Sequence, residues 1–182
     1  AAKTTTLGAY ADARRGARVL YLAFNKAIQL EAATRMPPNV TCRTTHSIAW
    51  RKARQLFGEQ AGDRIGATYP STVARALGCS ALVASGALQA VQRWCGSLDP
   101  RIELDHVPLD IAMRLADPSV AVRAAREVWL RMTDACERDL KLPHDGYLKL
   151  FQMDRPPLRG YDVIAVDEAQ DPVQPFVGSR GR

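Results

Sequence analysis

Residues 1–60 alternate between short apolar runs and stretches with helical spacing. Residues 18–24 (Arg-Val-Leu-Tyr-Leu-Ala-Phe) form a continuous apolar run of strand length, and residues 40–44 form a second β-type run. An apolar run without polar alternation is typical of a strand that is covered on both faces of a sheet. The two runs therefore predict buried strands.

Helices are predicted between and beside these strands, over residues 3–13, 26–36 and 47–57. Asn25 is suited to cap the second of these helices, a Pro-Pro pair ends it, and Gly58 ends the third. Strands and helices that alternate in this order predict an α/β domain with a parallel sheet.

The rhythm changes to purely helical spacing over residues 61–150, and a buried strand is expected again at residues 161–166. Two amphipathic helices are expected in this stretch, over residues 80–95 and from residue 119 onward, and Ser119 is a candidate N-cap of the second. Their apolar positions are Ala84, Leu88, Val91 and Cys95 in the first, and Ala125, Val128, Trp129, Met132 and Cys136 in the second. We expect an α/β domain from residues 1–60 and 151–177, a helical insertion at 61–150 and a loose tail at 178–182.

Composition narrows the classes of protein that remain. The chain has 182 residues, of which 47% are hydrophobic and 24% are charged, which is ordinary for a folded domain. No apolar run approaches the ~20 residues of a membrane-spanning helix, and no secretory signal is visible. The net charge is +6, and residues 1–50 carry seven Lys/Arg against two Asp/Glu, or +5. A basic front end favours a polyanionic partner such as nucleic acid or nucleotide, although a merely soluble basic surface would look the same.

The cysteines and histidines do not suggest a zinc site. No two cysteines are spaced as Cys-x-x-Cys, and the histidines form no compact cluster with them. We interpret the cysteines as reduced core residues of an intracellular protein, cytoplasmic or nucleoid-associated in a bacterium and nuclear in a eukaryote. The residues are Cys42, Cys79, Cys95 and Cys136, with His46, His106 and His144.

The strongest chemical signal is a pair of carboxylates that follows the strand at 161–166. Asp167 and Glu168 open the string Asp-Glu-Ala-Gln-Asp, which also contains Gln170. Ligands of open α/β sheets bind at the carboxyl ends of the strands. A carboxylate there can hold Mg²⁺, and a second one can polarise a water for attack on a γ-phosphate. A solvated acidic turn is the simpler explanation of Asp-Glu alone, but not of the whole string.

A second signal is the string Lys-Thr-Thr-Thr-Leu at residues 3–7, where a helix is expected to begin. A P-loop ends in Gly-Lys-Ser/Thr, so that backbone N–H groups, the lysine and the hydroxyl meet the phosphates and Mg²⁺. Here Ala2 stands where the last glycine of that motif would be. An ordinary helix start would be the better interpretation of this string alone, and the downstream Asp-Glu strengthens the P-loop interpretation.

Two polar segments follow the first two strands: Phe-Asn-Lys at residues 24–26 and Thr-Thr-His-Ser at residues 44–47. Both are expected at the same edge of the sheet, where an aromatic ring and cations suit contacts to single-stranded nucleic acid. Helix capping is an equally simple role for Asn25 and Ser47, and His46 alone would more often be a packed histidine.

These four strings, in this order, resemble Walker A, motif Ia, motif Ib and Walker B of UvrD/Rep-like superfamily 1 DNA helicases. The segment at residues 144–150 (His-Asp-Gly-Tyr-Leu-Lys-Leu) also resembles the F-box DNA helicase branch of that family. The resemblance spans nearly the whole chain. It implies a RecA-like P-loop NTPase domain with a parallel sheet, in which residues 61–150 form a helical accessory insertion.

The resemblance also implies roles for single residues. Lys3, Thr4 and Thr5 would bind ATP, with Thr4 and Asp167 at Mg²⁺. Glu168 would activate the attacking water, and Gln170 would sense the γ-phosphate. The residues that would contact single-stranded DNA are Phe24, Asn25, Lys26, Thr45, His46 and Ser47.

The implied parent activity is ATP-driven translocation on single-stranded DNA, in the 3′ to 5′ direction, with unwinding of duplexes. The P-loop glycines and the later motifs of the family are not found in the sequence, so a second RecA-like domain of the same protein is expected to be required for turnover. Three alternatives remain open at this point: a non-catalytic single-stranded nucleic-acid-binding remnant, a P-loop enzyme of another class such as a kinase or GTPase-like switch, and a piece that does not fold stably.

Overall fold

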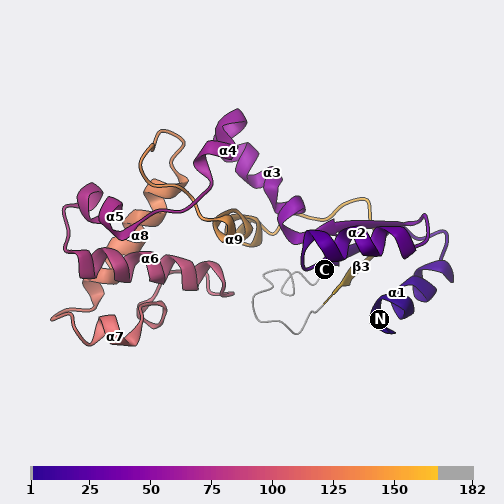
Figure 1. Cartoon of the computed structure of the whole chain (residues 1–182), viewed down its shortest axis with the longest axis horizontal. Coiled ribbons are helices and arrows are strands. Elements are labelled where there is room, and N and C mark those ends of the chain that lie inside the picture. Colours follow the sequence, from indigo (N-terminus) through magenta and orange to yellow (C-terminus); the bar gives the residue numbers. More distant parts are fainter. Residues whose placement is uncertain (1, 168–182) are drawn as a thin grey trace. The chain divides into compact units, whose positions relative to one another are not determined.

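The computed structural model describes the backbone of residues 2–167 and the side chains of residues 4–167 (Figure 1). The elements in chain order are α1 (Ala2–Asp12), β1 (Val19–Ala23), α2 (Lys26–Arg35), β2 (Val40–Thr44), α3 (Thr45–Phe57), η1 (Gly58–Gln60), α4 (Ala61–Arg64), α5 (Pro70–Leu77), α6 (Ala81–Cys95), η2 (Leu104–His106), α7 (Leu109–Ala112), α8 (Ser119–Thr133), α9 (His144–Asp154) and β3 (Val163–Val166).

Contacts divide the chain into two compact units. The first, which we call the sheet unit, comprises Ala1–Ala49 and Arg155–Arg182, and the second, which we call the helical unit, comprises Trp50–Asp154. The domain limits expected from the sequence, after residues 60 and 150, remain a prediction about the whole protein.

The sheet unit contains a parallel three-stranded sheet in the order β2-β1-β3. All five residues of the central strand β1 are buried, which explains why its sequence is apolar without alternation. The prediction of an α/β fold with a parallel sheet is confirmed, and β2 has the predicted bounds.

One face of the sheet is covered by helices. Side chains alternate between the faces of a strand, so Tyr21 and Ala23 of β1 point to the same side. They form a small core with Ala32 of α2, and Leu7 of α1 and Ala165 of β3 pack against it. Leu20 and Leu22 point to the opposite side and are also buried. The sheet is therefore buried on both faces at its central strand.

The predicted cap of α2 is confirmed, and α6 has a cap of the same kind that was not predicted. Asn25 has extended backbone angles, and its Oδ1 accepts a hydrogen bond from the backbone N–H of Ile28 at 2.9 Å. Ser80 caps α6 in the same way, with Oγ accepting from the backbone N–H of Val83 at 3.3 Å. Such caps satisfy N–H groups that the first turn of a helix leaves without partners.

Two expectations for α8 were wrong. Ser119 is the first residue of the helix and not its cap, because the Asp117 carboxylate accepts from both the backbone N–H and the hydroxyl of Ser119, at 2.9 and 2.6 Å. A carboxylate is a stronger acceptor than a hydroxyl. The helix ends at Thr133, so Cys136 lies in the following turn and is exposed rather than in the core. Helical spacing alone does not show where a helix stops.

The helical unit is built around the packing of α6 on α8. Trp94 and Trp129 meet edge to face, with ring centroids 4.8 Å apart. One parallel bridge, Ile65 with Leu142, is the isolated β-pairing found in this unit. Within residues 2–167 no single helix has the length and apolar character to cross a membrane; α5 and α6 reach that length only as a pair bent by 112°.

The segment at residues 144–150 lies in helix α9, where it contributes buried side chains to the helical unit. Lys149 is fully buried, and its Nζ donates to the carbonyl oxygens of Ser97 at 2.9 Å and Asp99 at 2.7 Å. The ammonium also lies 4.5 Å from the ring centroid of Trp94. Burial lowers the pKa of Lys149, and these contacts offset part of the cost of burying a cation.

Position 146, in the first turn of α9, has no room for a side chain larger than that of glycine. A Cβ at this position would lie 2.5 Å from Cδ1 and 2.7 Å from Cγ of the fully buried Leu142. The glycine therefore permits a close approach of the helix to the chain segment that precedes it.

We expect Gly146→Ala to lower the free energy of unfolding of the helical unit by about 1–3 kcal/mol, because the added methyl overpacks Leu142. Urea unfolding followed by tryptophan fluorescence measures this, since all three tryptophans lie in this unit. Gly62→Ala is the matched control, because a Cβ there meets no atom within 4 Å. Equal stability of the two variants would contradict the prediction.

Candidate functional site

The carboxyl ends of the three strands meet at one edge of the sheet. In the parallel register, Ala23 of β1 is aligned with Thr44 of β2, and Leu22 is aligned with Val166 of β3. The residues that follow the strands are Phe24, Thr45 and Asp167. Three of the four strings singled out in the sequence therefore emerge at the same edge.

The strand order favours a ligand site between the carboxyl ends of β1 and β3. The chain passes from β1 to β2 on one side, and the next strand, β3, lies on the other side of β1. In open α/β sheets, ligands bind in the crevice at the carboxyl ends of strands where the order reverses in this way. Asp167 lies at this point of the sheet.

Helix α1 begins at the same edge. Asn39 lies just before β2, at the amino edge of the sheet, and its Nδ2 donates to the carbonyl oxygens of Ala11 at 3.0 Å and Arg14 at 3.1 Å. The C-terminal end of α1 is thereby held at the amino edge. Because α1 lies along the sheet, its first turn, with Thr4, faces the carboxyl edge.

Tyr21 joins the two ends of this site. Its hydroxyl donates to Oδ2 of Asp167 at 2.9 Å, and the side chain of Thr4 lies close enough to affect the pKa of the phenol. Tyr21 is fully buried, and Asp167 is only 8% exposed. Burial and the neighbouring Asp167 carboxylate raise the pKa of Tyr21 well above its usual range, while the Thr4 side chain acts in the opposite direction. The phenol is therefore a hydrogen-bond donor at any physiological pH.

The side chains at this point fit a hard divalent cation bound together with a nucleotide. Asp167 and Thr4 supply carboxylate and hydroxyl oxygens, which are the ligand types that Mg²⁺ prefers. Within the described part of the chain, no group of three or more His, Cys, Asp or Glu side chains could hold a metal ion. Mg²⁺ in nucleotide sites is commonly bound through one or two protein ligands plus substrate phosphates, which agrees with this set.

Several residues predicted for the nucleotide site fall where side chains are not described. Lys3 lies in the first turn of α1, but only its backbone is described, and Glu168 and Gln170 lie outside the described residues. Thr5, also predicted to bind the nucleotide, is exposed beside the half-buried Thr4. The structure brings Thr4 and Asp167 together through Tyr21 and leaves the other assignments as predictions.

The segment at residues 24–26 is exposed. Phe24 is 48% exposed although it is a large apolar side chain. Asn25 caps α2, and Nζ of Lys26 donates to Oε1 of Gln29 at 2.7 Å. The cap occupies only the Oδ1 atom of Asn25, so capping and an interaction with an external ligand are compatible.

The segment at residues 44–47 forms a reciprocal cap at the start of α3. The Ser47 backbone N–H donates to Oγ1 of Thr44 at 3.1 Å, and the Thr44 backbone N–H donates to Oγ of Ser47 at 3.2 Å. Thr45 is only 8% exposed, whereas His46 is half-buried and Ser47 is exposed. Of the predicted DNA contacts in this segment, the Ser47 side chain is the most accessible.

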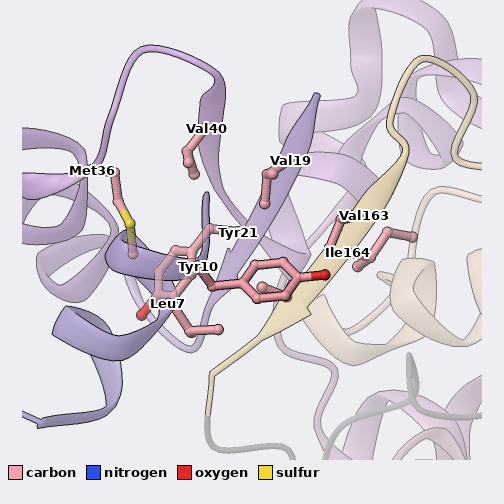
Figure 2. A pocket seen from close by; sticks show the side chains of 9 residues that line it. Leu7, Tyr10, Val19, Tyr21, Met36, Val40, Val163 and Ile164 are labelled. Atoms are coloured by element: carbon pink, nitrogen blue, oxygen red, sulfur yellow. The ribbon is translucent and has the colours of Figure 1, made fainter. Parts of the chain in front are cut away.

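An apolar cavity of about 190 Å³ lies between α1 and the sheet (Figure 2). Figure 2 shows Leu7 and Tyr10 of α1 on one side of it and Val19 and Val163 of the strands on the other. Tyr21 also lines the cavity. The apolar lining suits the packing of aliphatic or aromatic groups and provides no set of ligands for phosphate.

Comparison with known proteins finds relatives that match over most of the chain. The chain is similar to F-box DNA helicases. F-box DNA helicase 1 of chicken (Gallus gallus) is 33% identical over 185 residues, which cover 93% of this chain and 18% of that protein. F-box DNA helicase protein 1 of Schizosaccharomyces pombe is 26% identical over 191 residues, covering 93% of this chain and 22% of that protein. The chain thus spans about a fifth of the length of these relatives.

No protein-family model and no solved structure matches the chain. The similarity to F-box DNA helicases therefore concerns sequence, and the strand order and site geometry come from this structure alone.

Sequence analysis missed Tyr21. The apolar run at residues 18–24 was interpreted only as a buried strand, although it contains one hydroxyl group. A buried phenol needs a hydrogen-bond partner, so a tyrosine within an aliphatic strand is itself a signal of a nearby acceptor.

The alignment of β3 with β1 is held at the opposite edge by Asp162. Its Oδ2 accepts from the backbone N–H of Arg18 at 2.8 Å, and the Arg18 guanidinium lies 3.3 Å from Oδ1. The hydrogen bonds from the backbone N–H and then the side chain of Arg18 lower the pKa of Asp162. This clamp sets the register that places Asp167 beside β1.

We expect Asp162→Asn to loosen β3 in a pH-dependent way. A lowered folded-state pKa gives stability that is present above the unfolded pKa of about 3.9 and is lost as the pH falls through the lower folded value. The variant should therefore show faster hydrogen exchange of β1 and β3 amides than the wild type at pH 6–7, with the difference shrinking below about pH 4.

Asp12→Asn is the control for Asp162→Asn, because it removes an exposed ion pair between the last residue of α1 and Arg15 in the turn that follows. Its exchange should match the wild type throughout. A difference between Asp162→Asn and wild type that does not change with pH would show that the charge of Asp162 is not what holds the register.

Proposed function

We propose that this chain is the ATP-binding front part of a UvrD/Rep-like superfamily 1 DNA helicase of the F-box DNA helicase branch. The observation that carries the proposal is the meeting of Thr4 and Asp167 at the carboxyl edge of a parallel sheet, where the strand order reverses. The similarity to F-box DNA helicases over 93% of the chain supports it. The sheet unit would be a RecA-like P-loop domain, and residues 61–150 would be its helical insertion.

In this proposal the nucleotide binds between α1 and the end of β3. Lys3, Thr4 and Thr5 at the start of α1 hold the phosphates of ATP, because a helix N-terminus and a lysine favour anions. Asp167 holds Mg²⁺ or a water bound to it, together with the Thr4 hydroxyl. Bound Mg²⁺ supplies neutralisation of the phosphate charge in the transition state. Glu168 accepts a proton from the attacking water, and Gln170 senses the γ-phosphate.

Single-stranded DNA follows the same edge of the sheet. Phe24 offers an exposed ring for stacking on a base, and Lys26 offers a charge for the backbone. The other polar residues proposed to contact DNA at this edge are Asn25, Thr45, His46 and Ser47. Because nucleotide and DNA meet at one edge, opening and closing of this domain against a second RecA-like domain would move the strand, in the 3′ to 5′ direction.

The nucleotide site is tested by Mg²⁺-dependent binding of a fluorescent ATP analogue to the 182-residue chain. We expect saturable binding that is weakened at least about tenfold by Lys3→Ala and by Asp167→Asn, because charge-assisted contacts to phosphate and metal are lost. Circular dichroism shows whether each variant is folded. A folded wild-type chain that binds no nucleotide would leave a non-catalytic nucleic-acid-binding protein as the better description.

The DNA edge is tested with fluorescein-labelled oligodeoxythymidylate and two variants of one helix. Lys26 and Arg35 are the first and last residues of α2, so Lys26→Ala and Arg35→Ala change the net charge equally at opposite edges of the sheet. We expect Lys26→Ala to weaken binding and to reduce the salt dependence by roughly one phosphate contact, and Arg35→Ala to have little effect. Phe24→Ala should weaken binding by about 1–3 kcal/mol with an unchanged salt dependence. Equal effects of the two charge variants would indicate a diffuse basic surface.

A further inference from the structure

The structure assigns a positioning role to Tyr21: its buried hydroxyl orients the Asp167 carboxylate for the divalent cation that accompanies the nucleotide. This inference rests on the proposed function, because it concerns the same site. It adds a residue that lies inside a strand, touches no phosphate in the proposal, and precedes the exposed segment at residues 24–26.

The first argument is the energetic cost of a hydroxyl at this place. Tyr21 is fully buried in the central strand, between two leucines that are also buried. Phenylalanine would fill the same volume without a polar atom, and burying a hydroxyl without a partner costs free energy. The hydroxyl therefore stabilises the structure only through its hydrogen-bond partner, which is Asp167 Oδ2 at 2.9 Å.

The second argument is the geometry at the end of β3. The Asp167 backbone N–H donates to the carbonyl oxygen of Leu22 at 2.9 Å, which continues the ladder between β3 and β1 by one residue. The backbone of Asp167 is thus held by Leu22 of β1, and its side chain is held by Tyr21 of the same strand β1. A carboxylate held at both points keeps one orientation, with Oδ2 occupied by the phenol.

The third argument is that the same hydroxyl lies close to Thr4. The two side chains proposed to meet Mg²⁺ come from elements that are far apart in the sequence, α1 and the end of β3. Tyr21 is hydrogen-bonded to Asp167 and lies close enough to Thr4 for the Thr4 side chain to lower the pKa of its hydroxyl. A single rigid side chain in the central strand therefore sets the separation of a hydroxyl and a carboxylate, as preorganisation of a cation site requires.

The decisive variant is Tyr21→Phe, which removes one oxygen and leaves the ring in place. We would measure the affinity of the 182-residue chain for a fluorescent ATP analogue, first in EDTA and then as a function of Mg²⁺ concentration. The expected result is an Mg²⁺ concentration for half-saturation about tenfold higher than in the wild type, with unchanged affinity in EDTA. A merely structural role of Tyr21 would instead lower both affinities together.

Two further variants separate this inference from the proposed function. Tyr10→Phe is the matched control, because it removes the hydroxyl of a tyrosine on α1 that is 40% exposed, and it should behave as the wild type. Asp167→Asn should abolish the Mg²⁺ dependence. If Asp167→Asn does so while Tyr21→Phe matches the wild type or binds Mg²⁺ more tightly, the positioning role is overturned and the proposed function stands. If the folded wild-type chain binds no nucleotide, the proposed function fails and this role fails with it.

Discussion

The parallel pairing of β1 with both of its neighbours is the constraint on which the sheet unit depends. Because all three strands run in one direction, their ends gather the segments at residues 24–26 and 44–47 and the start of the acidic string at one edge. An antiparallel β3 would place Asp167 at the other edge, beside Asn39. The register matters as much as the direction, since a shift of one residue would turn side chains of β3 to the opposite face. The clamp between Arg18 and Asp162 and the bond from the Asp167 backbone to Leu22 fix that register at both ends of the strand.

Much of the sheet unit follows from local sequence. The strands are short apolar runs, Asn25 is a strong cap, and their alternation leaves few topologies for an α/β domain. The edge at which Asp167 lies could be predicted for the same reason. The contact between Tyr21 and Asp167 could not be predicted, because it joins residues 146 positions apart. It also depends on the strand order β2-β1-β3, in which β3 pairs with the side of β1 that is opposite β2. Periodicity gives strands but not their order in a sheet.

In the helical unit, the positions of helices were easier to predict than the roles of single residues. Two of its helices, α6 and α8, were predicted from apolar spacing, yet the roles of single residues were not. Lys149 looks like a surface residue of an amphipathic helix, but the structure buries it against two carbonyl groups and Trp94. Gly146 looks like a helix breaker, but it makes room for Leu142. Both residues lie in the segment that resembles F-box DNA helicases, and both have a role in packing. The start of α8 was misjudged as well: the Asp117 carboxylate accepts from the backbone N–H of Ser119, which is the first residue of the helix rather than its cap.

The ion pair between Lys52 and Asp154 has a consequence for how the chain folds. These residues lie at the two ends of the helical unit, Trp50–Asp154, and Trp50 also meets Tyr147 edge to face with ring centroids 5.4 Å apart. Pairing of Val19 with Val163 would otherwise require closure of a loop of more than a hundred residues, which costs chain entropy before any contact repays it. Once the helical unit has folded, its entry and exit are adjacent, and the loop that remains to be closed is short. We therefore expect the helical unit to form before β3, with the carboxylate that follows it, joins the sheet.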